Sequence, residues 1–341
     1  MKRVQFLVFT VILLAACGTP SQTGFDEFSE VVEVTAYDSL FSDKGGELMG
    51  TVSGMEIKNG LLVLAHSSDE YRYSFVDARS GRLLKRWGKT GQGPDEFATF
   101  GMGFVLGDSL LSFMGNRTLN YVSVPDILSG RQPVGKTVVP CPYTVDFRPF
   151  SYHEAGGYKV FTGAFANGYL GILGPDNAIV PQAFDYPFST DPLEGIFRGS
   201  VYQGMVRANG ARHRFVSILF RSDVFEIYEW GDGGIRKVCT GPFRHVPQVM
   251  QRGTRYGLDG KNSIGGLRRV AVSDKWVCFQ YSPEKGTLSE TYRDIYCYDW
   301  DGNKVKKYVL PFPVGLFCVD DEYLYAMCER DDYSVVCRFK L

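Results

Sequence analysis

The chain has 341 residues, of which 44% are hydrophobic and 14% aromatic, and its 37 Lys and Arg residues nearly balance 38 Asp and Glu. This composition excludes a disordered, collagen-like or coiled-coil chain and supplies enough apolar residues for a large core. The net charge is −1 and no run of five like charges occurs, so we expect no nucleic-acid partner.

The N-terminal residues have the pattern of a lipoprotein signal peptide. Lys2 and Arg3 precede an apolar stretch, residues 4–14, that is too short to span a bilayer. Leu-Ala-Ala-Cys at 14–17 resembles the bacterial lipobox, in which the cysteine is lipidated and becomes the first residue after cleavage. We therefore predict residues 1–16 to be the signal peptide and Cys17 to be the lipidation site. The alternative is an ordinary secretory signal with Cys17 near its cleavage site by chance.

The predicted anchor has consequences for location. Residues 17–29 begin with small polar residues and are predicted to be the lipidated cysteine and a flexible tether to a body at 30–341. Gly18 rather than Asp follows the cysteine, which by resemblance to enterobacterial sorting permits transfer to the outer membrane. No acidic run of the kind associated with surface export follows. We expect a cell-envelope protein, held on the membrane by its lipid and facing the periplasm.

Seven further cysteines lie in the predicted body, and no two have CxxC spacing. An exported protein can form disulfides, but a body of this size does not need them, and the sequence leaves their pairing open. Five of the seven lie in strand-like runs and are interpreted as small buried hydrophobes: Cys278, Cys297, Cys318, Cys328 and Cys337.

The body is predicted to be all-β. From residue 31 onward, short runs rich in Val, Ile, Phe and Tyr recur between Gly, Asp, Asn and Ser turns, without helical periodicity. In the first clear unit the expected strands are 51–58, 60–66, 71–77 and 82–87. Short turns join them, so the unit is predicted to be a four-stranded antiparallel meander.

Two turns of this unit recur along the chain. The turn between the third and fourth strands recurs at intervals of 49, 50, 56 and 69 residues, around Asp77, Asp126, Asp176, Asp232 and Asp301. The turn before the second strand recurs at 58–60, 107–109, 155–157, 273–275 and 320–322. A period of about fifty residues is typical of a four-stranded propeller blade, and residues 30–341 suffice for six. Five or seven blades, or an array of β-sandwiches, are the alternatives.

The two ends of the body are complementary. The last unit supplies only three expected strands, 314–319, 322–328 and 333–340, whereas residues 31–37 form a strand-like run without a unit of its own. We predict that this N-terminal strand completes the last blade and closes the ring, which also covers a sheet edge.

A family resemblance rests on one motif. Residues 83–97 read LLKRWGKTGQGPDEF, and they resemble the blade-linking element of NHL-type repeats and, more closely, of the six-bladed TolB-like propeller lipoproteins of Bacteroidetes. WVCFQYS at 276–282 resembles a strand of the same family. The resemblance implies a fold and no particular reaction. In physical terms, Gly88, Gly91 and Gly93 permit unusual backbone angles, and Phe97 is expected to fill the space between blades.

Catalytic signals are few. His66, His153, His213 and His245 show no metal-ligand spacing, and no Gly-x-Ser-x-Gly elbow is present. Related six-bladed hydrolases hold calcium in the central channel, but spacing places neither Glu56 nor Asp146 there. No cofactor is evident, and a channel calcium belongs only to an alternative in which the protein is a metal-assisted hydrolase or lyase. Whether the protein is an enzyme stays open.

The most irregular stretch is residues 241–269, between the expected fourth and fifth blades. It carries five arginines and Lys261 against one acid, Asp259. A solvated glycine-rich loop is one interpretation. The other is a cap over one mouth of the propeller that binds an anionic or sugar-like ligand, because Arg offers paired donors and Tyr a stacking face. The candidate ligand-binding residues are Arg244, His245, Arg252, Arg255, Tyr256, Arg268 and Arg269.

These observations favour an envelope-anchored binding or scaffold lipoprotein. It would recognise a glycan, a peptide or a partner protein through one face of the propeller, because loops on a rigid scaffold commonly carry binding sites.

Overall fold

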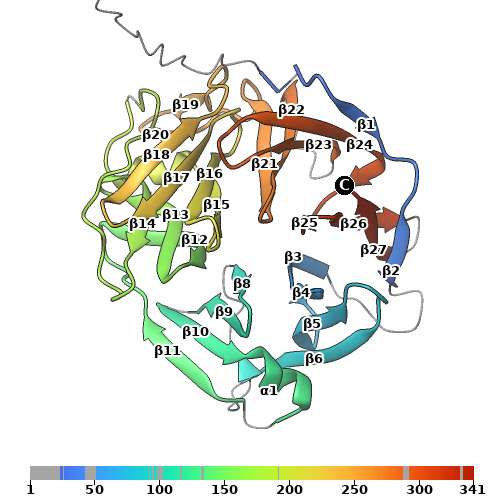
Figure 1. The fold of residues 1–341 in the computed structure, drawn as a ribbon. Coiled ribbons are helices and arrows are strands. Elements are labelled where there is room, and N and C mark those ends of the chain that lie inside the picture. The colour runs from blue at the N-terminus through green and yellow to red at the C-terminus, as the bar shows by residue number, and fades with distance from the viewer. Residues whose placement is uncertain are drawn as a thin grey trace, which may run out of the picture.

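The computed structural model describes residues 24–25, 27–42, 51–91, 93, 96–97, 103–115, 117–131, 134–190, 192–286, 292–330 and 333–341. The strands of these residues form seven sheets, of which six are arranged as blades around a central opening (Figure 1) and the seventh is a two-stranded hairpin. The predicted six-bladed, all-β propeller is confirmed. No helix in the described part is long and apolar enough to cross a membrane.

The first three blades differ in their outer parts. Blade 1 consists of β3 (Thr51–Lys58), β4 (Leu61–Ser68), β5 (Tyr71–Asp77) and β6 (Leu83–Thr90), with β7 (Glu96–Phe97) parallel to β6. Blade 2 consists of β8 (Phe104–Leu106), β9 (Leu110–Met114), β10 (Thr118–Ser123) and β11 (Lys136–Pro140). Blade 3 contains β12 (Phe147–Ala155), β13 (Tyr158–Phe165) and β14 (Gly168–Leu173). Two short helices, α1 (Val124–Ser129) and α2 (Ile196–Val201), follow β10 and β14, respectively.

The last three blades include both N-terminal strands. Blade 4 consists of β15 (Gly204–Asn209), β16 (Arg214–Leu219), β17 (Phe225–Gly231) and β18 (Gly234–Thr240), and a hairpin of β19 (Val249–Arg252) and β20 (Arg255–Leu258) follows it. Blade 5 consists of β21 (Ile264–Val272), β22 (Val277–Lys285), β23 (Tyr292–Tyr298) and β24 (Lys304–Val314), with β1 (Val31–Glu33) at its outer edge. Blade 6 consists of β25 (Phe317–Val319), β26 (Tyr323–Arg330), β27 (Tyr333–Lys340) and β2 (Asp38–Ser42).

An N-terminal strand closes the last blade, as predicted, but the segment differs from the one expected. β2 pairs antiparallel with β27, and its Phe41 is buried in the core between blades 6 and 1. Residues 31–33, in the segment expected to do this, instead pair in parallel with β24 of blade 5. The difference in burial fits this arrangement, because Phe41 is buried in the core between blades 6 and 1, whereas Val31 of β1 is exposed and Val32 is only partly buried against the core between blades 5 and 6.

The described end of the predicted tether packs on the ring. Phe25 is buried between blades 4 and 5, stacked on Tyr281 at a centroid distance of 4.3 Å. Lys304 donates a hydrogen bond to the Glu27 carbonyl over 3.2 Å. The packed part of the chain therefore begins before residue 29, where we expected the tether to end. Cys17 and the predicted signal peptide lie outside the described residues.

The motif that carries the family resemblance links two blades. The Phe97 ring contacts Trp87 of blade 1 at 5.2 Å and Phe113 of blade 2 at 4.9 Å, as expected of an interblade plug. Gly88 has a φ of 82°, in the left-handed region that favours glycine, and a Cβ there would meet the Phe97 ring at 3.0 Å. The motif therefore fixes the angle between blades 1 and 2.

The cysteine interpretation is confirmed for the five strand positions. Cys278, Cys297, Cys318, Cys328 and Cys337 are all buried, and no disulfide joins any of the seven described cysteines. Four of these five lie in one core cluster between blades 5 and 6, so they act as small core residues.

Candidate functional site at the axial mouth

A cavity of about 1370 Å³ opens at one mouth of the central channel. Its rim is formed by the turns between the first and second strands, to which every blade contributes: 58–60, 107–109, 155–157, 209–211, 273–274 and 320–322. These include the turns whose recurrence predicted the blades. The sequence did not predict that these turns form a site. Their recurrence indicates the length of the repeated unit but not the face of the ring on which the turns lie.

Hydrogen bonds near this mouth cross every junction between neighbouring blades. From blade 1 to blade 4, Asn59 donates to Asp108, Tyr121 donates to Glu154, and the Ala208 amide donates to His153 Nδ1. From blade 4 back to blade 1, the donor and acceptor pairs are Asn209 and Asp274, Lys275 N and Asp321, and Arg338 and the Ala78 carbonyl. The distances lie between 2.8 and 3.2 Å. The rim is therefore a closed belt that holds its polar groups in place.

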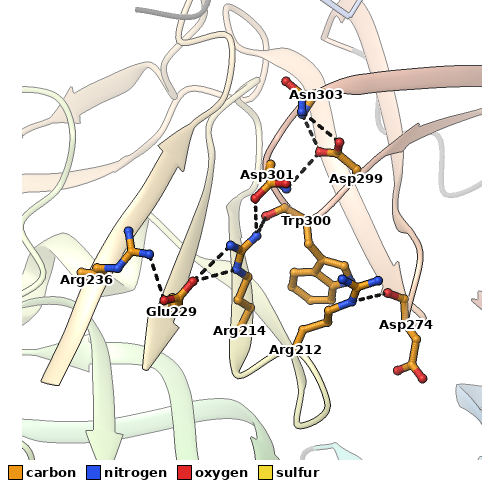
Figure 2. A network of polar contacts seen from close by, with 9 residues as sticks. All are labelled: Arg212, Arg214, Glu229, Arg236, Asp274, Asp299, Trp300, Asp301 and Asn303. Atoms are coloured by element: carbon orange, nitrogen blue, oxygen red, sulfur yellow. Dashed lines mark hydrogen bonds and ion pairs between the residues drawn. The ribbon is translucent and has the colours of Figure 1, made fainter. Parts of the chain in front are cut away.

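The junction of blades 4 and 5 carries the most extensive network, shown in Figure 2. Arg214 of β16 donates to the Trp300 carbonyl at 2.6 Å and to Asp301 at 2.7 Å, and it also binds Glu229. Arg212 donates to the Asp274 carbonyl at 2.8 Å. These contacts border a smaller cavity of about 370 Å³ beside the mouth.

An ion pair spans the channel beneath the rim. Arg207 Nε of β15 lies 3.5 Å from Glu56 Oε1 of β3, and their side chains are only 22% and 16% exposed. These strands belong to blades 4 and 1, which lie on opposite sides of a six-membered ring. The pair therefore crosses the axis, and its Glu56 lines the cavity and forms part of the cavity floor. Spacing left Glu56 unplaced, and the structure puts it at the centre, whereas Asp146 is exposed and does not line the cavity.

Burial controls the protonation of this floor. Burial raises the pKa of Glu56 above its ordinary value of 4.5, and the Arg207 charge opposes that shift. Burial, followed by the Arg207 charge, holds the pKa of His153 well below its usual range. His153 is therefore neutral at pH 7 and, since its Nδ1 accepts from Ala208, carries its proton on Nε2.

Acidic side chains outnumber basic ones around the cavity. Four Lys or Arg side chains contribute, Lys58, Arg79, Lys159 and Arg338. Seven carboxylates line it: Glu56, Asp108, Glu154, Asp274, Asp320, Asp321 and Glu322. Tyr121, Tyr323 and Tyr325 add aromatic surface. Carboxylates, amides and aromatic rings together can bind hydroxyl, amide or cationic groups of a ligand.

None of the seven residues predicted from the basic segment lines this cavity. Neighbouring strands of a blade are antiparallel, so the connection after a fourth strand leaves from the face opposite the turn between strands one and two. The β19–β20 hairpin therefore arises on the other face, and Figure 1 shows it toward the outer edge of the ring. Arg252, Arg255 and Tyr256 lie together on this hairpin.

The other predicted residues lie where the segment joins the blades. The Asp223 carboxylate accepts the backbone N–H groups of Arg244 and His245. Arg268 stacks over Phe220 at 5.8 Å, and Arg269 is the next residue of β21. Both are partly buried. The sequence prediction thus combined exposed hairpin residues with residues that position the segment.

Metal-ligand chemistry has no visible support in the described part of the chain. Within it, no group of three or more His, Cys, Asp or Glu side chains is arranged to hold a metal ion. Glu56 pairs with an arginine, and the rim carboxylates are used largely across blade junctions.

By its geometry the protein is a six-bladed β-propeller with a polar axial cavity. The comparisons agree, because the family model described as TolB-like 6-blade propeller-like matches residues 176–322, from the end of blade 3 into blade 6. This match and the six-bladed fold agree with the resemblance to TolB-like propellers that the blade-linking motif indicated.

Two solved structures from Bacteroides share the fold at low sequence identity. A candidate exported protein of Bacteroides fragilis NCTC 9343 is 13% identical with a TM-score of 0.53, covering 95% of this chain and 98% of that one. A member of the duf4221 family from Bacteroides vulgatus is 11% identical with a TM-score of 0.54, covering 89% and 94%. No curated protein matches the sequence.

Proposed function

We propose that the protein is an envelope-anchored binding lipoprotein that holds its ligand, a glycan, a peptide or a segment of a partner protein, in the axial cavity. The observation that carries this proposal is the cavity itself, with a rim locked by hydrogen bonds across all six junctions. A site whose polar groups are already held in place loses little conformational freedom on binding. The lipobox-like sequence and the exported Bacteroides neighbour support the envelope location.

No observation favours the hydrolase or lyase alternative. Among the described residues, Glu56 is paired with Arg207 and His153 accepts the Ala208 amide, and no thiol with a lowered pKa lies on the cavity floor. Burial instead raises the pKa of the nearby Cys318 thiol. These contacts support recognition of a ligand as the role we propose for the cavity.

The experiment is a screen of glycan and peptide libraries, followed by affinity measurements with two variants. Glu56→Gln removes the floor charge while keeping the side-chain shape, and we expect it to weaken binding by about tenfold or more, as for a hydrogen bond to a charged group. Ala211→Trp places a large ring at the rim and should block entry. Arg252→Ala/Arg255→Ala is the matched control on the other surface. A ligand that binds both cavity variants as tightly as the wild type would place the site elsewhere.

A further inference from the structure

The β19–β20 hairpin and the neighbouring helix α2 form an exposed aromatic and basic surface. Arg252 and Arg255 face each other directly across the hairpin, and both are exposed. Helix α2 contacts β20. Tyr256 of β20 is 39% exposed, and Phe197 of α2 is 68% exposed. We call Phe197, Arg252, Arg255 and Tyr256 the hairpin patch.

Three acids of the segments next to the hairpin patch are engaged elsewhere. Glu27 pairs with Arg244 at 3.5 Å, Asp223 accepts the backbone amides of the segment, and Asp259 binds Asn262 at 2.6 Å. Glu194, just before α2, is exposed and is the nearest carboxylate in the sequence to Phe197. Arg252 and Arg255 make no ion pair with any described residue, so their charges face solvent.

The attachment of the N-terminal segment places this surface near the predicted anchor. Phe25 is fixed between blades 4 and 5, and Glu27 contacts Arg244 of the same inserted segment that forms the hairpin. Only residues 18–23 separate Gly24 from Cys17, the predicted lipidation site, and the chain from Cys17 to Gly24 spans at most roughly 25 Å. A lipid on Cys17 would hold this edge of the ring close to the membrane.

We propose that the hairpin patch binds the surface of an anionic phospholipid bilayer and thereby orients the propeller on its anchor. Arginine pairs with phosphate, and aromatic side chains favour the boundary between headgroups and acyl chains. The lipid anchor alone would leave the body free to rotate, and the patch adds a second, charge-dependent contact. This inference rests on the anchoring part of the proposed function and not on the ligand in the cavity.

The test follows hydrogen exchange in the hairpin. The full-length protein as isolated from cells is bound to vesicles of phosphatidylcholine alone or of phosphatidylcholine mixed with phosphatidylglycerol. We expect exchange of the 249–258 amides to slow only on the mixed vesicles, and added salt to reverse the effect. Arg252→Ala/Arg255→Ala should lose the slowing, and Arg252→Lys/Arg255→Lys should keep most of it. Arg82→Ala/Arg131→Ala removes the same charge from exposed positions around blades 1 and 2 and should behave like the wild type.

Several outcomes would overturn the proposal. These are unchanged exchange on both vesicles, equal slowing on phosphatidylcholine alone, or equal slowing in the Arg252→Ala/Arg255→Ala variant. Slowing by a soluble acidic peptide, without any effect of mixed vesicles, would assign the patch to a protein partner instead. Ligand affinity at the cavity is measured separately in detergent, so loss of one property does not imply loss of the other. The acyl mass of the isolated protein reports whether the anchor itself is present.

Discussion

The axial mouth and the hairpin patch use similar residue types in opposite ways. At the mouth, Arg207 is largely buried and paired with Glu56, and its neighbours are held by hydrogen bonds between blades. On the hairpin, Arg252 and Arg255 are exposed and lack ion-pair partners among the described residues. The mouth is built before any ligand arrives, whereas the hairpin can adapt to an irregular charged surface.

The contrast shows that local density of basic residues is a poor guide to a preformed site. The segment at 241–269 stands out in the sequence because its six basic residues lie within 29 positions. The mouth draws one turn from each blade, so its residues are dispersed along most of the chain. Substitutions that affect one region and not the other test this contrast.

Loss of the predicted anchor at Cys17, which would make the hairpin side the membrane side, should have the strongest effect. Cys17→Ser removes the thiol that the predicted pathway must lipidate before cleavage and acylation of the new amine, so acyl labelling should disappear and the protein should leave the membrane fraction. Fractionation of cells and metabolic labelling with a fatty acid measure both. The hairpin patch is not expected to retain the protein at physiological salt, because two exposed charges bind weakly. A variant that fractionates like the wild type would show that anchoring has another cause.

The next effect concerns ring closure, on which the shape of the mouth depends. Phe41→Ala in β2 removes a buried ring from the core between blades 6 and 1, and we expect a loss of about 3 kcal/mol in the free energy of unfolding. Val32→Ala in β1 changes a partly buried residue at the outer edge of blade 5 and should cost less than about 1 kcal/mol. Denaturant unfolding measures both. Equal losses would mean that β1 contributes as much to closure as β2.

A smaller effect separates the two arginine environments directly. Arg207→Met leaves Glu56 without its partner in a largely buried position, so we expect a loss of about 2 kcal/mol in the free energy of unfolding. Arg255→Met makes the same change on the hairpin and should cost less than about 0.5 kcal/mol, because the side chain is exposed. If the two variants unfold at the same denaturant concentration, the ion pair across the channel contributes nothing to the stability of the ring.

The smallest effect is a dependence of stability on pH that arises at the mouth. Because the pKa of Glu56 is raised in the folded protein, the folded state binds this proton more tightly than the unfolded chain. The wild type should therefore gain stability relative to Glu56→Gln as the pH falls from 7 through the raised pKa towards the ordinary value of 4.5. Unfolding of both proteins at each pH gives the difference, and the contribution of His153 cancels since both contain it. A constant difference between the two proteins would show that burial does not shift this carboxyl.

Local sequence patterns predict the features that depend on neighbouring residues. The four strands of blade 1 lie within three residues of their predicted ends, because each begins and ends at a local turn signal. The burial of the strand cysteines and the interblade position of Phe97 also follow from short-range pattern and from the blade period. In blade 2, by contrast, the predicted turn at Asp126 is the short helix α1, which begins with Ser123 accepting the Asp126 amide.

Features that depend on closure of the ring could not be predicted from the sequence, because they arise from contacts between residues that are far apart in the chain. β2 and not β1 completes blade 6. Phe41 of β2 is buried in the core between blades 6 and 1. The Glu56–Arg207 pair forms because blades 1 and 4 lie on opposite sides of the channel, which is narrow enough for the two side chains to meet. The face on which a turn lies depends on strand direction, which reverses at every turn. The six turns therefore meet at one mouth while the basic hairpin lies on the other face, and no single stretch of sequence contains that information.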